Sequence, residues 1–416
     1  MMKTVSDKEK FIWNMMGSLA NALSTLVLTI CVNRILGGAS GGLFAFAYAN
    51  AQLMLTIGLF EVRPYQSTDI DEKYSFNAYF TMRIVTCALM FIISVMYVFV
   101  NGFNMEKSAI IVLLVMFKMV EAFTDVYGGR FQQKDRIDLS GKLFFVRVAL
   151  STVVFAALAY FTKSLVAASA GMFLTSFLLF FIYDNRYTFA DDKKNLALEV
   201  KPVFYIVRDV LPLFIGSFIL MYISNAPKYA IERIYDSSVQ NVYSILFMPA
   251  FAINLFSVFI FRPLLISMAE RWNTGNLKSL AKIVLFMYVS ITCITLLALI
   301  VSWLLGIPVL SLLYNIDLDE YRMELQMVMF IGGLSALMSF ASNVIVVMRK
   351  QKYLMFGYIT AFVFSLIFPD ILVKNSGIDG AILSYGLAVG LLVIVFTIII
   401  ICSGFWAKKL KGKKAV

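Results

Sequence analysis

Residues 279–304 read SLAKIVLFMYVSITCITLLALIVSWL, a run of 26 residues in which Lys282 is the one charged side chain. A helix needs about 20 consecutive apolar residues to cross the hydrocarbon core of a bilayer, so this stretch predicts a transmembrane helix. Eleven further stretches of comparable apolarity occur along the chain. The twelve lie near residues 11–35, 41–61, 79–100, 108–128, 143–162, 165–183, 206–234, 241–263, 279–304, 324–347, 353–373 and 380–402. We therefore expect an all-α integral membrane protein with about twelve transmembrane helices.

The gaps between these stretches differ in positive charge. When the N-terminus is placed in the cytoplasm, most Lys and Arg of the gaps and tails fall on the cytoplasmic side. The outer gaps hold only Lys107, Lys163, Arg322 and Lys374. Cytoplasmic loops of membrane proteins are enriched in Lys and Arg. We expect a multi-pass protein of the cell membrane with both termini in the cytoplasm.

Composition excludes several classes of function. Hydrophobic residues make up 61% of the chain and charged residues 15%, against about 25% charged residues in soluble domains. The net charge of +11 is placed in loops and the tail, where lipid headgroups use it, so no nucleic-acid partner is expected. Histidine is absent, which removes imidazole catalysis and histidine-ligated metals.

No cofactor or metal site is indicated by motif either. The four cysteines all fall inside predicted spans without the close spacing of metal or redox pairs, at Cys31, Cys87, Cys293 and Cys402. No Walker-type phosphate loop occurs. The outer gaps are short, which leaves no obvious place for an active site outside the bilayer. We expect a non-enzyme without catalytic residues, cofactor or metal.

The two halves of the chain align at a shift of 199 residues. NRI at residues 33–35 falls on ERI at 232–234, and FEVRP at 60–64 falls on FIFRP at 259–263. Six spans return the chain to the same side, so the repeat is parallel. It predicts a six-helix bundle in residues 1–190, a cytoplasmic linker at 184–205, and a second six-helix bundle with a basic tail in 206–416. The linker is either an interfacial helix or a tether. Two such bundles around a central cavity are typical of alternating-access carriers.

Ionisable residues inside spans cost about 2.5–3.5 kcal/mol each on insertion scales, so each needs a reason. The fourth span carries Lys118, Glu121 and Asp125 on one helical face. This face is expected to look into the cavity between the halves, although a Lys–Glu pair at this spacing can also neutralise itself. Function and snorkelling to the interface explain five arginines near the ends of spans equally well. Arg34 and Arg233 lie near outer ends, and Arg83, Arg147 and Arg262 lie near cytoplasmic ends.

The seventh span holds a second polar face, with Asn225, Lys228 and Glu232 at spacings of three and four and Arg233 beside them. Arg34 lies near the outer end of the first span. Several Lys and Arg in a cavity suit an anionic cargo such as a diphosphate. Our hypothesis assigns cargo binding to Lys228, Asn225, Arg34, Arg233 and Lys118. It assigns charge pairing or ion coupling to Glu121, Asp125 and Glu232, with Glu232 holding the Lys228 ammonium when cargo is absent.

Four motifs carry a resemblance to a known family. They are YQSTD at residues 65–69, GGRFQQK at 128–134, NAPKYAIE at 225–232 followed by VYS at 242–244, and GIDGA at 377–381. With the rest of the chain, they resemble Wzx-type flippases in the polysaccharide-transporter branch of the multidrug/oligosaccharidyl-lipid/polysaccharide exporter superfamily. The resemblance implies twelve helices in two bundles around a cationic cavity. It also implies a cargo of undecaprenyl-diphosphate-linked oligosaccharide, moved to the outer leaflet for cell-surface polysaccharide assembly, with Asn225 and Lys228 as the positions carried over.

The leading hypothesis is therefore a flippase for a lipid-linked oligosaccharide. Such a flippase would interact with the lipid-linked oligosaccharide and with membrane lipids. A polysaccharide polymerase and glycosyltransferases are further candidate partners. A multidrug or cation antiporter of the same superfamily is the alternative within transport. A membrane-bound glycosyltransferase or polymerase is a third class.

Overall fold

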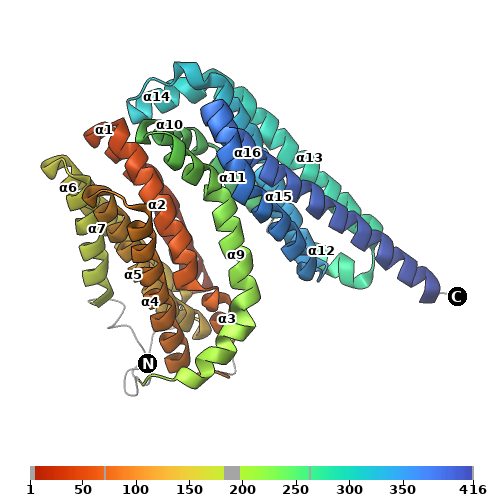
Figure 1. Cartoon of the computed structure of the whole chain (residues 1–416). Coiled ribbons are helices and arrows are strands. Elements are labelled where there is room, and N and C mark those ends of the chain that lie inside the picture. Colours follow the sequence, from red (N-terminus) through yellow and green to blue (C-terminus); the bar gives the residue numbers. More distant parts are fainter. Residues whose placement is uncertain (1–4, 70–71, 182–196, 262–263, 415–416) are drawn as a thin grey trace. The chain divides into compact units, whose positions relative to one another are not determined.

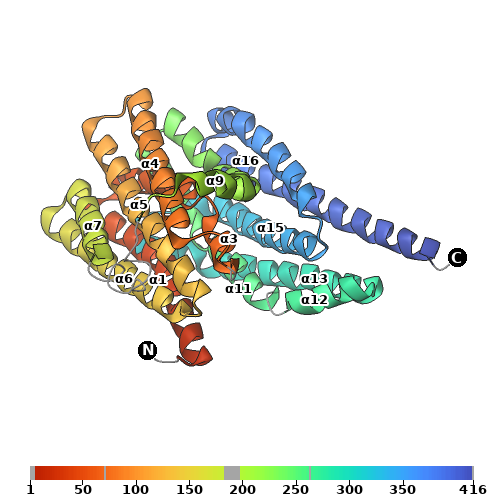
Figure 2. The same ribbon diagram turned by 90° about the horizontal axis from the view of Figure 1, so that it is seen from below.

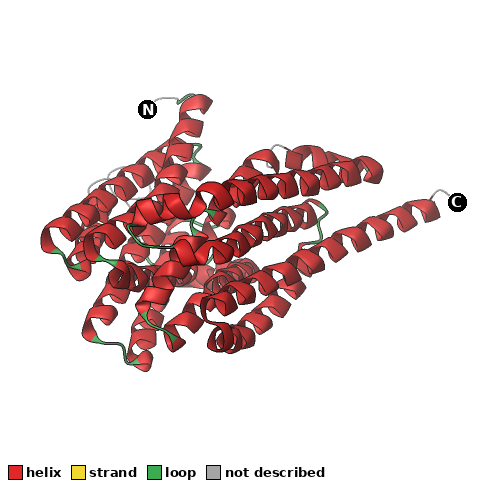
Figure 3. Cartoon of the chain, turned by 90° about the horizontal axis from the view of Figure 1, so that it is seen from above, coloured by secondary structure: helices red, strands yellow, loops and turns green. Residues whose placement is uncertain are grey.

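The computed structural model describes residues 5–69, 72–181, 197–261 and 264–414 (Figure 1). These residues fold into helices joined by short turns, and no strand occurs among them (Figure 3). By length and composition, nine of the described helical segments can cross a membrane. The all-α membrane fold predicted from the apolar stretches is confirmed.

The chain divides into two compact units, residues 1–221 and 222–416. The division falls inside one helix, α9 (Val200–Ile234). Of the predicted linker at 184–205, residues 184–196 lie outside the described residues, and residues 200–205 form the first turns of α9. The repeated Arg262 and Pro263 also lie outside the described residues.

Among the described residues, the first unit contains seven helices and the first part of α9. The seven are α1 (Asp7–Leu36), α2 (Gly38–Leu59), α3 (Val62–Thr68), α4 (Phe76–Asn101), α5 (Met105–Gln133), α6 (Ile137–Thr162) and α7 (Leu165–Leu179). Side-chain caps start several of them, as at Ser75, whose hydroxyl accepts from the Ala78 backbone N–H. Such a cap satisfies one of the free N–H groups of a first helical turn.

Helix α1 runs along α6 (Figure 2). The two backbones approach closely at Gly141, where an added Cβ would lie 2.4 Å from the Trp13 carbonyl oxygen. Glycine is therefore needed at this position for the helices to meet.

Helix α5 contacts α2, α3, α4, α6 and α7, which places it at the centre of the first unit. It is also the predicted span with three ionisable residues, Lys118, Glu121 and Asp125. Their side chains thus enter the interior of this unit, where lipid does not reach them.

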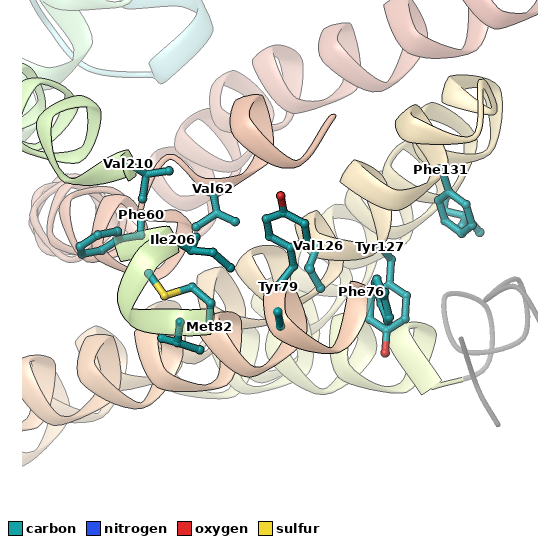
Figure 4. Packing of buried hydrophobic residues seen from close by; sticks show 13 residues of the cluster. Phe60, Val62, Phe76, Tyr79, Met82, Val126, Tyr127, Phe131, Ile206 and Val210 are labelled. Carbon is teal, nitrogen blue, oxygen red and sulfur yellow. The ribbon is translucent and has the colours of Figure 1, made fainter. Parts of the chain in front are cut away.

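An apolar core lies at the end of the first unit where α3 begins (Figure 4). Ile206 and Val210 from α9 are fully buried against Phe60, which directly follows α2, and against Val62 of α3 and Met82 of α4. Burying a side chain of this size contributes about 1.5–3 kcal/mol where water is the alternative. This packing fixes the first part of α9 to the first unit.

The second unit consists of the rest of α9 and the helices that follow. These are α10 (Ser237–Phe247), α11 (Ala250–Phe261), α12 (Leu264–Thr274), α13 (Leu277–Val301), α14 (Ile307–Tyr314), α15 (Arg322–Val347) and α16 (Leu354–Lys414). Helix α15 packs against α10, α11, α12, α13 and α16. It is the central helix of this unit.

Helix α16 is two helices joined at a break. Ser376 and Gly377 leave the helical conformation, and Gly377 has φ +57° and ψ −130°, a combination that a residue with a Cβ rarely adopts. The break falls between the predicted spans 353–373 and 380–402. With α16 divided, and with α5 and α7 included, each of the twelve predicted spans corresponds to a helix or to the pair α10 and α11.

Candidate functional site

Lys118, Glu121 and Asp125 of α5 make two separate sets of ionic contacts inside the first unit. Nζ of Lys118 lies 2.8 Å from Oε2 of Glu121. The Lys118 side chain is 1% exposed, and its ammonium lies 5.2 Å from the centre of the Tyr48 ring. The self-neutralising Lys–Glu pair considered from the sequence is therefore present, with an aromatic face beside it.

Asp125, one turn further along α5, binds two arginines. Its Oδ1 accepts from Arg63 at 3.0 Å and its Oδ2 accepts from Arg83 at 2.8 Å. Arg83 is fully buried and also donates to the carbonyl oxygen of Gly58, near the end of α2. Arg63 donates to Ser140 of α6 at 3.1 Å. One carboxylate thus joins α3, α4 and α5, and Arg63 extends the contact to α6.

A polar cavity of about 180 Å³ lies beside this network, within the first unit. Its lining comes from α1, α2, α3, α5 and α6. The lining residues are Asn14, Gly17, Ser18, Leu59, Arg63, Glu121, Thr124, Asp125, Gly128, Phe131, Ser140, Gly141, Phe144 and Arg147. Arg147 is 4% exposed and lies over the Phe144 ring. The cavity is large enough for several water molecules.

Charged side chains of both signs lie at the cavity. Two cations line it, Arg63 and Arg147, and two more, Lys118 and Arg83, pair with its carboxylates. The carboxylates in the lining are those of Glu121 and Asp125. Guanidinium groups in a low-dielectric site bind phosphate or carboxylate oxygens with charge-assisted hydrogen bonds. Such a lining can accept an anionic group.

Sequence reasoning left Arg83 and Arg147 undecided between function and snorkelling, and it used Arg63 only for topology and for the repeat. The structure places all three in this region, bonded to or lining it. The sequence signal for Arg63 was the proline that follows it, because an arginine that only anchors the helix at the membrane surface does not require a neighbouring proline. The spacing of residues gave no sign that Arg63 and Arg83 pair with Asp125, which lies 62 and 42 residues away.

The predicted residues of the seventh span lie in the second unit, on α9. Asn225 is 5% exposed, and Lys228 and Glu232 are partly buried. Among the residues that the structure describes, Lys228 makes no ion pair or hydrogen bond, so the predicted Lys228–Glu232 pair is not formed in this conformation. Arg233 instead donates to Oδ1 of Asp370 on α16, with its Nε at 3.2 Å.

Arg34 is an exposed residue in the last turn of α1. The structure therefore brings Lys118, Glu121 and Asp125 together in the first unit. It places Asn225, Lys228, Glu232 and Arg233 on one helix of the second. That these two groups of residues face one central cavity stays a prediction.

Metal-binding chemistry is not indicated within the described ranges. They contain no group of three or more Cys, Asp or Glu residues arranged to hold a metal ion. All four cysteines are free thiols.

The fold is similar to that of solved transporters. An inward-facing multidrug resistance MATE family transporter of the MOP superfamily shares it at 12% identity with a TM-score of 0.66, over 97% of this chain and 98% of that chain. A MOP superfamily transporter from Pyrococcus furiosus, reported with a binding pocket of reverse polarity, matches at 13% identity with a TM-score of 0.56, over 97% and 95%. A MATE transporter from Vibrio cholerae in a bent form matches at 12% identity with a TM-score of 0.52, over 96% and 98%.

Sequence comparison identifies the family. Among curated proteins none matches the chain. A family model described as polysaccharide biosynthesis protein matches residues 8–268. That match covers the first unit, with its buried charge network, and extends through α9 to the start of α12. The fold is that of MOP-superfamily transporters, and the chain belongs to the polysaccharide biosynthesis protein family.

Proposed function

We propose that this membrane transporter is a flippase for undecaprenyl-diphosphate-linked oligosaccharides, which it moves across the cell membrane for cell-surface polysaccharide biosynthesis. The observation that carries the proposal is the group of four cations, Arg63, Arg83, Lys118 and Arg147, at and beside the polar cavity of the first unit. A permanent anion such as a diphosphate is complementary to guanidinium and ammonium groups. Membership in a polysaccharide biosynthesis family supports the same cargo.

Transport in this proposal proceeds by alternating access between the two bundles. The cargo diphosphate is held in transit by Lys228, with Asn225 beside it, Arg34 and Arg233 toward the outer side, and Lys118 from the first bundle. Lys228 is the strongest candidate, because it is partly buried and carries no counter-ion among the described residues. Glu121, Asp125 and Glu232 set how many positive charges are available at each step. Polymerase and glycosyltransferases are the proposed partners.

Deletion of the gene followed by lipid extraction tests the function. A flippase defect accumulates the undecaprenyl-linked repeat unit in the inner leaflet and lowers surface polysaccharide, and the intact gene restores both. Normal surface polysaccharide and unchanged lipid-linked intermediates after deletion would contradict the proposal.

A multidrug or cation antiporter is the second candidate. Two observations favour it, namely the MATE transporters among the structural neighbours and the two carboxylates at the polar cavity. Dye efflux decides between the two functions. Loss of efflux with normal surface polysaccharide identifies the antiporter, and the reverse pattern identifies the flippase. If the protein were a membrane-bound glycosyltransferase or polymerase, deletion of its gene would instead leave the lipid-linked sugar unextended.

A further inference from the structure

A second, apolar groove lies in the second unit, apart from the charged cavity. It has a volume of about 730 Å³ and runs between α13 and the last part of α16, with Met348 at the end of α15 beside it. Small-molecule sites commonly measure about 300–1,000 Å³. Aliphatic side chains form most of the lining, for example Leu280, Val284 and Ile400. The groove therefore suits a hydrocarbon chain.

The two ends of the groove differ. At one end are Gly275, Asn276 and Lys278, which belong to the turn between α12 and α13 and to the first turn of α13. At the other end the hydroxyl groups of Tyr288 and Thr397 lie 2.8 Å apart and join α13 to α16. The end with Lys278 is the polar mouth of the groove, and the Tyr288–Thr397 hydrogen bond marks its inner end.

The length of the groove matches one leaflet. Eleven helical positions separate Leu277 from Tyr288, about 17 Å at 1.5 Å per residue. Half of the bilayer's hydrocarbon core is about 15 Å thick. A chain that enters at the mouth reaches the inner end near the middle of the bilayer, which fits an acyl chain better than a much longer polyprenyl chain.

Two cations lie at or next to the mouth, Lys278 and Arg271. Lys278 is exposed and makes no ion pair among the described residues. Arg271 donates from Nε to Ser279 at 2.7 Å, so a second cation is fixed to the first turn of α13. By the predicted orientation this mouth faces the cytoplasmic leaflet, whose surface is anionic.

We propose that the groove between α13 and α16 binds one anionic phospholipid, with its phosphate at Lys278 and an acyl chain along α13. The site is separate from the proposed cargo site and does not depend on the cargo. A bound lipid would join α13 to the last part of α16 from outside and hold this face of the second unit together.

Native mass spectrometry of the full-length protein tests this site, with dioleoyl phosphatidylglycerol and dioleoyl phosphatidylcholine as probes. The wild-type protein is expected to bind phosphatidylglycerol about fivefold more tightly, because a Lys near the membrane surface contributes about 1 kcal/mol toward anionic lipid. Lys278→Gln removes this preference. Lys282→Gln is the matched control, since Lys282 is an exposed lysine one turn further along α13 that does not line the groove.

Ala281→Trp fills the groove and is expected to abolish the tight binding of both lipids, whereas Lys278→Gln abolishes only the discrimination. Three results overturn the proposal. The first is equal affinity of wild-type protein and Lys278→Gln for phosphatidylglycerol, and the second is an equal loss in Lys282→Gln. The third is displacement of the bound phospholipid by stoichiometric undecaprenyl phosphate, which would assign the groove to the polyprenyl carrier.

Discussion

Asp125 holds two guanidinium groups, one of which, that of Arg83, has no access to solvent. Removing one partner of a buried ion pair leaves an uncompensated charge and costs about 3–5 kcal/mol. Asp125→Asn is therefore expected to lower the unfolding temperature and the membrane abundance of the protein. Arg63→Gln is expected to cost less, because Asp125 keeps its ion pair with Arg83 and the arginine that is removed is 33% exposed.

The double variant Asp125→Asn with Arg83→Met provides the control for this prediction. It removes the fully buried cation together with its carboxylate, and replacing a buried ion pair by apolar groups is often neutral. Stability close to wild type is the expected result, measured by thermal unfolding in detergent. A double variant as unstable as Asp125→Asn alone would show that the two residues do not act as a pair.

Lys228 is the residue on which the transport proposal depends most. Lys228→Gln is expected to lower surface polysaccharide by about tenfold or more, since a hydrogen bond to a charged group contributes about 1.5–3 kcal/mol. Lys228→Arg keeps the charge and should retain most activity. Each variant is compared at equal membrane abundance. Full transport by a normally inserted Lys228→Gln protein would rule out Lys228 as the diphosphate anchor.

At the scale of the element, the break in α16 rests on one backbone conformation. Gly377 has a positive φ, and its added Cβ would meet nothing closer than 3.6 Å, so the penalty of a substitution there is backbone strain. Such strain costs about 1–3 kcal/mol. Gly377→Ala is expected to destabilise the protein by that amount in thermal unfolding.

Gly390 lies further along the same helix with open space around it and provides the comparison. Gly390→Ala should be neutral or stabilising by about 0.5–1 kcal/mol, because Ala restricts the unfolded chain and favours helix. Equal effects of the two substitutions would mean that the break does not require glycine.

The turn between α3 and α4 is tied to the end of α5 by Glu72. Hydrogen bonds from Lys134 and Arg130 hold the pKa of Glu72 below its ordinary value. The resulting stabilisation is present above the unfolded-state pKa of about 4.3 and is lost as the pH falls through the lower folded-state pKa. Glu72 is 41% exposed, so the effect is small, at most about 1 kcal/mol. Wild type should unfold at a higher temperature than Glu72→Gln at pH 7, and the difference should shrink below pH ~4.

At the scale of the whole molecule, the distribution of Lys and Arg predicts the orientation. Reporter fusions at residue 205 and at the C-terminus are expected to lie in the cytoplasm, and a fusion at Lys163 is expected to lie outside. An alkaline phosphatase fusion that is active at residue 205 would reverse the orientation. It would also move the mouth of the α13–α16 groove to the outer leaflet.

The sequence alone predicted a multi-pass membrane protein and where its apolar helices lie. Transfer of apolar side chains into lipid is nearly additive along the chain, so stretches such as 279–304 can be recognised without knowledge of their neighbours. Even the break at Gly377 was visible, as a short gap between two apolar stretches. The charged span at 108–128 was recognised as exceptional for the same reason.

Only the tertiary structure decided which charges meet. Asp125 binds Arg63 and Arg83, which lie 62 and 42 residues away, while Lys228 does not bind Glu232, one turn along its own helix. Such partners depend on how each helix is rotated and which helices pack beside it, and apolar periodicity is weak in a span that lipid and protein both surround. Position along the chain therefore predicted the helices, and packing between them selected the ion pairs.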